Sequence, residues 1–297
     1  MVLPVGHHGR MAERDVFDSS RWRPRRIARF ALHFTIVELQ SLVFAIAIFA
    51  ALAVSAVVPL PIPRYDALFL FGVALTLVLW AVGWETGREV LVILAFHLIG
   101  LALELFKVHE GSWSYPEEAF TKVAGVPLYA GFMYAAVGSY IVQAWRRMDL
   151  RVTDFRLVTM SILAVLAYAN FFTHHWIPDL RWVIAAAFVI ALWRTLVHFT
   201  VGGHRYRMPL VLSFLGIGAA LWFAENAATF LGAWKYPDQL EVWRSVHVGK
   251  VGSWSLLVSL SFVLVAILKY VEGELFGHPG DKPAVEPHHR GETPATE

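Results

Sequence analysis

The stretch ENAATFLGAWKYP, residues 225–237, begins with an acid inside an apolar segment and ends in the pattern Gly-x-Trp-x-Tyr-Pro. The stretch ELFKVHEGSWSYP, residues 104–116, has the same pattern. Glu104 and Glu225 each stand seven residues before the glycine of their copy, and 225 minus 104 and 237 minus 116 both equal 121. A constant offset of this kind predicts an internal parallel duplication. The two repeat halves are expected at about 34–146 and 156–271.

The composition around these stretches is that of a membrane protein. Of the 297 residues, 57% are hydrophobic and only 16% are charged, and the mean hydropathy is +0.55. Soluble domains are about 45–50% apolar and about 25% charged. The apolar residues also form blocks near the ~20 residues that a helix needs to cross a bilayer. We therefore predict an all-α polytopic membrane helix bundle over residues 31–272.

The apolar blocks predict about eight transmembrane helices, and residues 156–200 alternatively fit a re-entrant hairpin. Outside the bundle, the Arg-rich residues 1–30 are predicted to be a basic cytoplasmic segment. Residues 273–297, rich in Pro and Gly, are predicted to be a disordered cytoplasmic tail. The predicted spans are about 34–58, 66–84, 88–108, 125–145, 156–173, 180–200, 207–231 and 252–271.

The basic residues predict the orientation of the bundle. The connections after the fourth and sixth predicted spans are rich in arginine, whereas the loops on the opposite side carry fewer basic residues over longer stretches. By the positive-inside rule, both termini are cytoplasmic and both Gly-x-Trp-x-Tyr-Pro turns face outward. We expect a multi-pass protein of a bacterial inner membrane. The arginines that decide this are Arg146, Arg147, Arg151, Arg156, Arg205 and Arg207.

Several classes of chemistry are excluded by what the sequence lacks. The chain has no cysteine, so disulfides, thiolate catalysis, iron–sulfur clusters and Cys-type zinc sites are ruled out. Phosphate-loop and dinucleotide signatures are absent, and nothing predicts nucleic-acid binding. We expect no cofactor and no metal site. The expected partners are the lipid bilayer and a lipophilic small molecule, and the oligomeric state stays open.

The two acids are the leading candidates for function. A carboxylate within a span costs roughly 2.5–3.5 kcal/mol on insertion scales, so it faces a cavity, a partner or a substrate. Aromatic residues and Gly at the end of a span also fit an interfacial belt and a helix terminus, which is the alternative interpretation of the motif. If the motif binds substrate, the contacts come from Trp113, Tyr115, Trp234, Tyr236 and Asn226.

Other polar residues in the spans predict a proton supply for these acids. His97 lies seven residues before Glu104, on the same helical face. His174 and His175 follow Asn170 by one turn. A neutral histidine that donates to a carboxylate or carbonyl is the alternative. The predicted catalytic set is Glu104, Glu225, His97, Asn170, His174 and His175.

Three segments carry a resemblance to a known family: residues 97–140, NFFTHH at 170–175, and 207–237. They resemble the bacterial membrane proteins called domain of unknown function 817, over about residues 30–271. This resemblance implies a multi-span membrane fold and no established activity.

A more distant resemblance is to the small, duplicated membrane lycopene cyclases and the related carotenoid hydratases. These carry an acid seven residues before Gly-x-Trp-x-aromatic, and they imply an isoprenoid- or carotenoid-like substrate. The cyclases continue with Pro-Leu-Glu-Glu, whereas Pro127-Leu128 is followed here by Tyr129-Ala130. The acid pair that the resemblance would assign to protonation of a polyene is missing.

Three functions remain open on the sequence. The first is an enzyme that acts on a lipophilic substrate by intramembrane acid chemistry. The second is a proton-coupled transporter or carrier, and the third is a non-catalytic membrane component whose motifs hold two halves together. In each case we expect Glu104 and Glu225 to approach each other, with Trp113 and Trp234 above them on the outer side.

Overall fold

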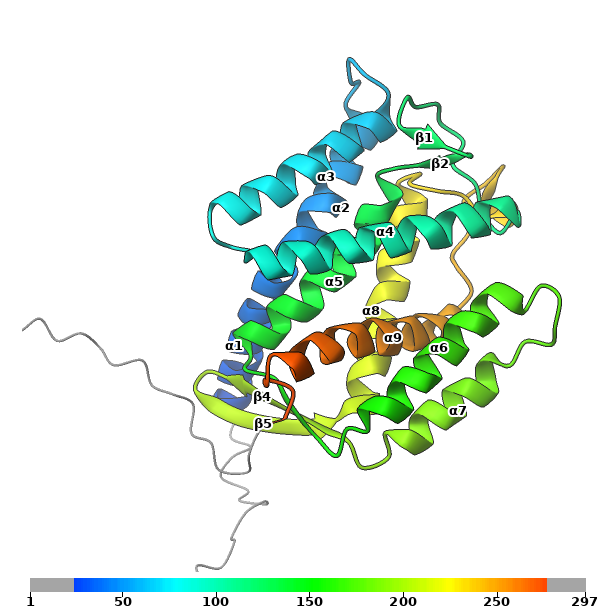
Figure 1. Cartoon of the computed structure of the whole chain (residues 1–297). Helices are drawn as coiled ribbons and strands as arrows, with labels where there is room; N and C mark the ends of the chain where they lie inside the picture. The colour runs from blue at the N-terminus through cyan, green and yellow to red at the C-terminus, as the bar shows by residue number, and fades with distance from the viewer. Residues whose placement is uncertain (1–23, 277–297) are drawn as a thin grey trace, which may run out of the picture.

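Most of the chain is helical in the computed structural model, which describes residues 24–276 (Figure 1). Four helices are long and apolar enough to cross a membrane, and a bent pair gives a fifth. The four are α3 (Arg64–Ala81), α4 (Gly87–His109), α8 (Leu210–Phe230) and α9 (Lys250–Val271), and the bent pair is α1 (Pro24–Ser41) with α2 (Val43–Val57). The other helices are α5 (Ala130–Arg147), α6 (Leu157–Thr173) and α7 (Arg181–Ala191).

Apolar helices that suit a membrane are thus confirmed, and three predicted spans agree with α3, α4 and α9 to within a few residues. Helix α6 has nearly the predicted bounds, but with 17 residues it is shorter than the candidate spans. The predictions for residues 1–23 and for the tail from 277 lie outside the described residues.

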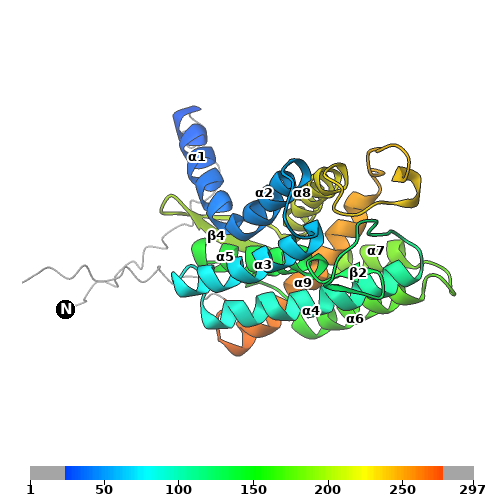
Figure 2. The same ribbon diagram turned by 90° about the horizontal axis from the view of Figure 1, so that it is seen from above.

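The first predicted span, 34–58, is not one straight helix. It bends by 68° between α1 and α2. Ser41, which is buried, donates its hydroxyl to the carbonyl oxygen of Val37 at 2.9 Å. The chain turns at the next residue, Leu42, whose φ of −92° and ψ of 5° depart from helical geometry between the two helices. Beyond the bend, α1 points outward from the bundle in Figure 2 while its Phe30 and Phe34 pack on the sheet through Tyr206 and Phe199.

The predicted span 180–200 is wrong in its second half. Helix α7 has 11 residues, about 16 Å at ~1.5 Å per residue, against ~30 Å of hydrocarbon. The chain then forms an antiparallel sheet that the all-α prediction lacks, in the order β3-β4-β5. Its strands are β3 (Arg151–Thr153), β4 (Leu196–Val201) and β5 (His204–Pro209).

Strand β4 was not predicted, because its alternation of buried and half-buried residues covers only a few positions within a longer apolar run. Val197, Phe199 and Val201 are buried while the residues between them are half-buried, which is a period of two. Gly202 and Gly203, at φ 57° and 76°, then make the tight turn to β5. The predicted span 207–231 accordingly starts as a helix only at Leu210.

In the predicted span 125–145, the helix also begins later than predicted, because a hairpin comes first. Residues 122–127 form a small hairpin of β1 (Lys122–Val123) and β2 (Val126–Pro127). Its turn places Ala124 and Gly125 at φ 46° and 83°, which a helix does not allow. Helix α5 therefore begins at Ala130.

Two pairs of helices pack closely enough to shape the bundle. Helix α4 packs on α5 and α8 packs on α9, while α2 meets α5 and α6 meets α9. A Cβ at Gly131 of α5 would lie 2.7 Å from the His97 carbonyl oxygen of α4, and one at Gly218 of α8 would lie 2.7 Å from the Ser255 nitrogen of α9. Both crossings therefore bring backbone against backbone, as small residues permit in membranes.

Candidate functional site

Helices α4 and α8 end with the same set of backbone hydrogen bonds. Gly111 donates to the Val108 carbonyl at 3.0 Å, and Gly232 donates to the Thr229 carbonyl at 3.1 Å. Both glycines have a positive φ, 67° and 72°, the left-handed conformation that ends helices. Each atom pair in one turn therefore has its counterpart 121 residues later.

The two turns also pair with each other. Ser114 donates to the Lys235 carbonyl at 3.0 Å and Lys235 donates to the Ser114 carbonyl at 3.0 Å. Because 235 minus 114 is 121, this is a reciprocal contact between equivalent residues, as a local two-fold axis produces. We call this part of the bundle the turn end. The opposite part, at strands β3 to β5, is the sheet end.

Glu104 lies in a closed shell of neutral donors at the turn end. Its Oε2 accepts from Trp113 Nε1 at 2.6 Å and from the Tyr115 hydroxyl at 2.8 Å. Its Oε1 accepts from the Tyr134 hydroxyl of α5 at 2.8 Å. The residue is buried, and among the described residues no cation lies within ion-pair distance of it. Glu104 thus ties the turn to α4 and α5.

Glu225 has a different shell, which includes a cation. Its oxygens accept from the Tyr236 hydroxyl and, at 2.6 Å, from Trp254 Nε1 of α9. Lys250 Nζ lies 3.8 Å from Glu225 Oε1 and donates to the Tyr236 hydroxyl at 2.9 Å. The Glu225 side chain is 1% exposed and that of Lys250 is 36% exposed. These contacts form a continuous path from a buried carboxylate to a solvent-accessible ammonium.

An aromatic contact joins the two shells. Trp113, bonded to Glu104, packs edge-on against Tyr236, bonded to Glu225, with 6.0 Å between ring centroids. Lys250 Nζ lies 4.4 Å from the Tyr236 centroid and 6.0 Å from that of Trp113. Burial and the Glu225 charge raise the pKa of the Tyr236 phenol well above its ordinary value. The phenol therefore holds its proton and acts as a donor.

Two predicted substrate contacts do not bond the acid of their copy. Trp234 lies beside the Tyr236 hydroxyl and packs on the buried cluster of α2, α3 and α5, and Trp254 takes the place beside Glu225 that Trp113 has beside Glu104. Asn226 donates to the Trp222 carbonyl at 2.8 Å and accepts from the Val246 nitrogen at 2.9 Å. Asn226 therefore holds the loop between α8 and α9.

His97 has no hydrogen-bonded link to Glu104, although the sequence predicted it as a proton supply for that acid. It packs against Phe132 with 4.4 Å between ring centroids, and its buried Nδ1 has no hydrogen-bond partner. Although it shares a face of α4 with Glu104, the described hydrogen bonds do not connect the two residues.

The remaining predicted catalytic residues gather where α6 meets the end of α4. Asn170 bonds to Asp179 and to the Leu180 nitrogen, at 3.1 and 2.8 Å. His174 faces two carbonyl oxygens of α6, and its pKa is lowered by burial and by the charge of Lys107. His175 Nε2 lies 3.0 Å from Lys107 Nζ. In residues 24–276 no three His, Asp or Glu side chains group as metal ligands.

Three residues of these shells, and Lys107 beside His175, were missed on the sequence. Tyr134 and Trp254 stand on the helix after their acid, at similar distances along the chain, since 134 minus 104 is 30 and 254 minus 225 is 29. That spacing is the signal that could have found them. On the sequence, Lys250 has the position of an ordinary loop cation, and Lys107 that of a basic residue in the last turn of a helix, so neither indicates a site.

Comparison with known proteins agrees with the resemblance to domain of unknown function 817. A family model described as "Protein of unknown function (DUF817)" matches residues 30–262. The chain is also 51% identical to the uncharacterized protein YoaT of Bacillus subtilis (strain 168) over 249 residues, which cover 83% of this chain and 94% of YoaT. No solved structure matches. The resemblance to lycopene cyclases and carotenoid hydratases stays a prediction.

Proposed function

This chain belongs to the DUF817 family of proteins of unknown function, and we propose that it is a membrane-embedded enzyme for a lipophilic substrate. The single observation that carries the proposal is the hydrogen-bonded path from Glu225 through Tyr236 to Lys250. A buried carboxylate joined to a phenol and an ammonium is an arrangement that moves protons. The chemistry is therefore acid–base catalysis at the turn end, on an isoprenoid-like substrate.

Each member of the path has a role that follows from its surroundings. Tyr236 is the group that exchanges a proton with substrate. When the Tyr236 hydroxyl gives its proton to substrate, the Lys250 ammonium, which donates to the same oxygen, replaces that proton and is itself reprotonated from solvent. Glu225 accepts from the hydroxyl and holds the phenol and the ammonium in place. The rings of Trp113 and Tyr236, which already lie beside the Lys250 ammonium, provide faces that stabilise positive charge in a substrate.

The two acids then have different roles. Glu104 is bonded only to neutral donors within a closed shell, so it is a structural acceptor that holds the first turn. Glu225 has the cation and the route to solvent, so it is the reactive copy. We thus assign the catalytic prediction to Glu225 alone and give Glu104 a positioning role.

The same proposal includes an internal duplication, in which α2–α5 and α6–α9 are two related sets of four membrane-embedded helices. It is supported by the equivalent bonds at Gly111 and Gly232, and by the reciprocal pairing of Ser114 with Lys235. The matched helix pairs, α4 on α5 with α8 on α9, and α2 on α5 with α6 on α9, support it further.

The test of the proposed chemistry compares lipid extracts of cells by mass spectrometry. Cells carry the wild-type gene, no gene, or a variant with Glu225→Gln or Tyr236→Phe. We expect a lipid species that changes on deletion and is restored by wild type, while each variant loses about a hundred-fold or more of the activity. The proton path is removed while the shape of each side chain is retained.

Two controls separate chemistry from folding. Tyr270→Phe removes a hydroxyl from an exposed tyrosine of α9 and should restore the lipid fully. Glu104→Gln should also retain most activity. Every variant is quantified in membranes and its thermal unfolding measured in detergent. Full restoration by Glu225→Gln would show that the carboxylate is structural and would overturn the enzyme proposal.

We also propose that the sheet end faces the cytoplasm of a bacterial inner membrane, because Arg146, Arg151, Arg205 and Arg207 lie there. Single cysteines are easily interpreted, since the chain has none of its own. Ser114→Cys in the exposed turn should react with an impermeant thiol reagent in intact cells, and His204→Cys in the exposed β4–β5 turn should react only after lysis. The reverse pattern would invert the orientation.

A further inference from the structure

Helix α1 packs against the sheet end through one of its faces. Phe30 and Phe34, one turn apart, contact Tyr206 and Phe199 of the sheet with 4.6 and 6.3 Å between ring centroids. Val37 continues this face and packs against the same buried cluster. Most of the remaining surface of α1 is exposed.

A second apolar stripe of α1 lies on the exposed side. Leu32, Ile36 and Leu39 are separated by four and seven residues, so they follow one another along one side of the helix. Their side chains are 59%, 45% and 51% exposed. We call these three residues the exposed stripe. A run of exposed apolar side chains marks a surface that contacts a membrane or another protein.

Basic residues run beside the exposed stripe. Arg25, Arg29 and His33 are spaced by four residues, so they form a line along the helix, and Arg26 lies next to this line. All four side chains are exposed. An exposed apolar stripe bordered by arginines is the pattern of an amphipathic helix that lies in a membrane interface.

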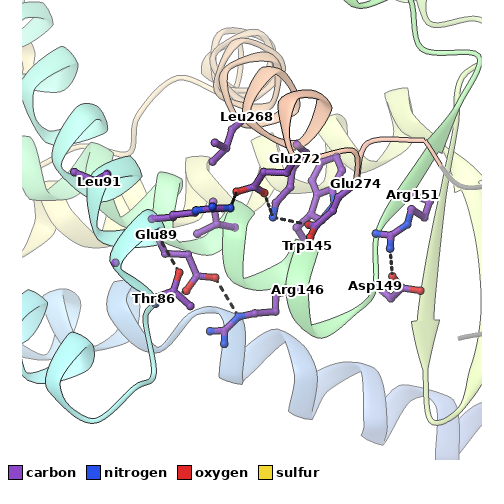
Figure 3. Close-up of a pocket in the computed structure, with 14 residues that line it drawn as sticks. Thr86, Glu89, Leu91, Trp145, Arg146, Asp149, Arg151, Leu268, Glu272 and Glu274 are labelled. Atoms are coloured by element: carbon purple, nitrogen blue, oxygen red, sulfur yellow. Dashed lines mark hydrogen bonds and ion pairs between the residues drawn. The ribbon is translucent and has the colours of Figure 1, made fainter. Parts of the chain in front are cut away.

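The three arginines of α1 differ from other charges at the sheet end. Near the ends of α4 and α5, Arg146 pairs with Glu89 at 3.0 Å and Arg151 pairs with Asp149 at 2.9 Å (Figure 3). Within residues 24–276, no carboxylate lies at ion-pair distance from the arginines of α1. These exposed guanidinium groups are therefore available to a negatively charged surface.

The bend between α1 and α2 gives α1 the orientation of an interfacial helix. Helix α2 has no charged residue from Val43 to Val57, so it suits the hydrocarbon of a bilayer. Helices in a bilayer tilt by about 20° from the membrane normal. The axis of α1 lies 68° from that of α2, and α1 points outward from the bundle in Figure 2. Helix α1 is therefore closer to the plane of the membrane than to its normal.

We propose that α1 lies in the membrane interface and binds anionic phospholipid, and that it is not the first half of a broken span. The exposed stripe enters the acyl region, and the three arginines contact lipid phosphates. A guanidinium suits this role because it binds phosphate oxygens through two parallel hydrogen bonds. A second copy of the chain would bring the same arginines and no negative charge to neutralise them. This inference is independent of the proposed function at the turn end.

The first test measures the depth of α1 in a bilayer. Because the chain has no cysteine, Leu32→Cys and Leu39→Cys can each carry one spin label in full-length protein, reconstituted in vesicles of phosphatidylcholine with phosphatidylglycerol. Depth follows from the accessibility of the label to oxygen and to a water-soluble nickel chelate. We expect both labels in the acyl region. His204→Cys, in the exposed β4–β5 turn, is the control and should contact the nickel chelate.

The difference in depth between the two labels distinguishes an interfacial helix from a broken span. Seven residues of helix are ~10 Å long. At 68° to an upright α2, they change depth by about 4 Å. As half of a span along the membrane normal, they would change depth by the full length of about 10 Å.

The second test removes the charges beside the labelled stripe. Arg25→Gln and Arg29→Gln, combined in the Leu32→Cys protein, should abolish the dependence of its immersion on phosphatidylglycerol. Each arginine near an anionic surface favours the immersed helix about five-fold, so the two changes should lower the ratio of immersed to free helix about thirty-fold. Arg244→Gln, at an exposed arginine of the turn end, is the control and should leave this ratio unchanged.

Four results would overturn the proposal. Contact of both labels with the nickel chelate would place α1 in water, and a depth difference of about 10 Å would mean a broken span. Dipolar broadening that disappears on dilution with unlabelled protein would mean that a second copy covers the exposed stripe. Immersion that does not depend on phosphatidylglycerol in the wild-type background would exclude the phosphate contact.

Discussion

Replacing Arg64 with methionine is expected to lower the free energy of unfolding by about 3–5 kcal/mol, the cost of breaking a buried charge network. The Arg64 side chain is 12% exposed and bonds to Glu117 at 2.8 Å. It also donates to the carbonyl oxygens of Leu231 at 2.8 Å and Leu52 at 3.2 Å. One guanidinium therefore joins the ends of α2 and α8 to the first turn.

Methionine keeps much of the side-chain volume, so the loss reports the lost bonds rather than a cavity. The free energy is measured by denaturant unfolding in micelles. Arg244→Met serves as the control, because Arg244 is exposed and takes part in no ion pair among the described residues; it should cost about 0–1 kcal/mol. Equal losses for the two variants would contradict the role given to Arg64.

Glu104→Ala is expected to cost more than about 3 kcal/mol, because it leaves three donors unsatisfied at about 1–3 kcal/mol each. These donors are Trp113, Tyr115 and Tyr134, all within 2.8 Å of the carboxylate. Their loss should also free the first turn, so that tryptophan fluorescence shifts toward that of water-exposed indole.

Glu104→Gln should recover more than half of this loss. Its amide oxygen still accepts from Trp113 and Tyr115, and its amide nitrogen can donate to the Tyr134 hydroxyl, which also accepts. Glu118→Ala, at an exposed position in the following loop, is the control and should be nearly neutral. If alanine and glutamine at position 104 cost the same small amount, the aromatic shell does not depend on the carboxylate.

The two shells together show how far the sequence leads at the candidate site. Both acids, Trp113, Tyr115 and Tyr236 could be predicted because each aromatic residue lies within 11 residues of the acid of its own copy, in a recurring pattern. Tyr134 and Trp254 carry only a weak signal, their similar spacing from the two acids, and Lys250 carries none, because all three come from the following helix. No local periodicity records which helix lies across from an acid.

The absence of long-range contacts from the local sequence also explains the errors in the predicted fold. Helices α3, α4, α6 and α9 are apolar over most of their length, and hydropathy found each of them. Strand β4 and helix α7 share one apolar run, and only the pairing of β4 with β3 and β5 makes its backbone extended. The bend between α1 and α2, where Leu42 leaves helical geometry, is likewise not recorded by hydropathy.

By itself, the sequence determined that this chain is a helical protein suited to a membrane, with two acid motifs 121 residues apart. Hydrophobicity and motif spacing are properties of neighbouring residues, so they can be read along the chain. The tertiary structure alone decided that Glu104 is sealed by neutral donors while Glu225 meets Lys250. Hydrogen-bond partners are set by how helices cross, and that geometry arises from packing between elements far apart in the chain.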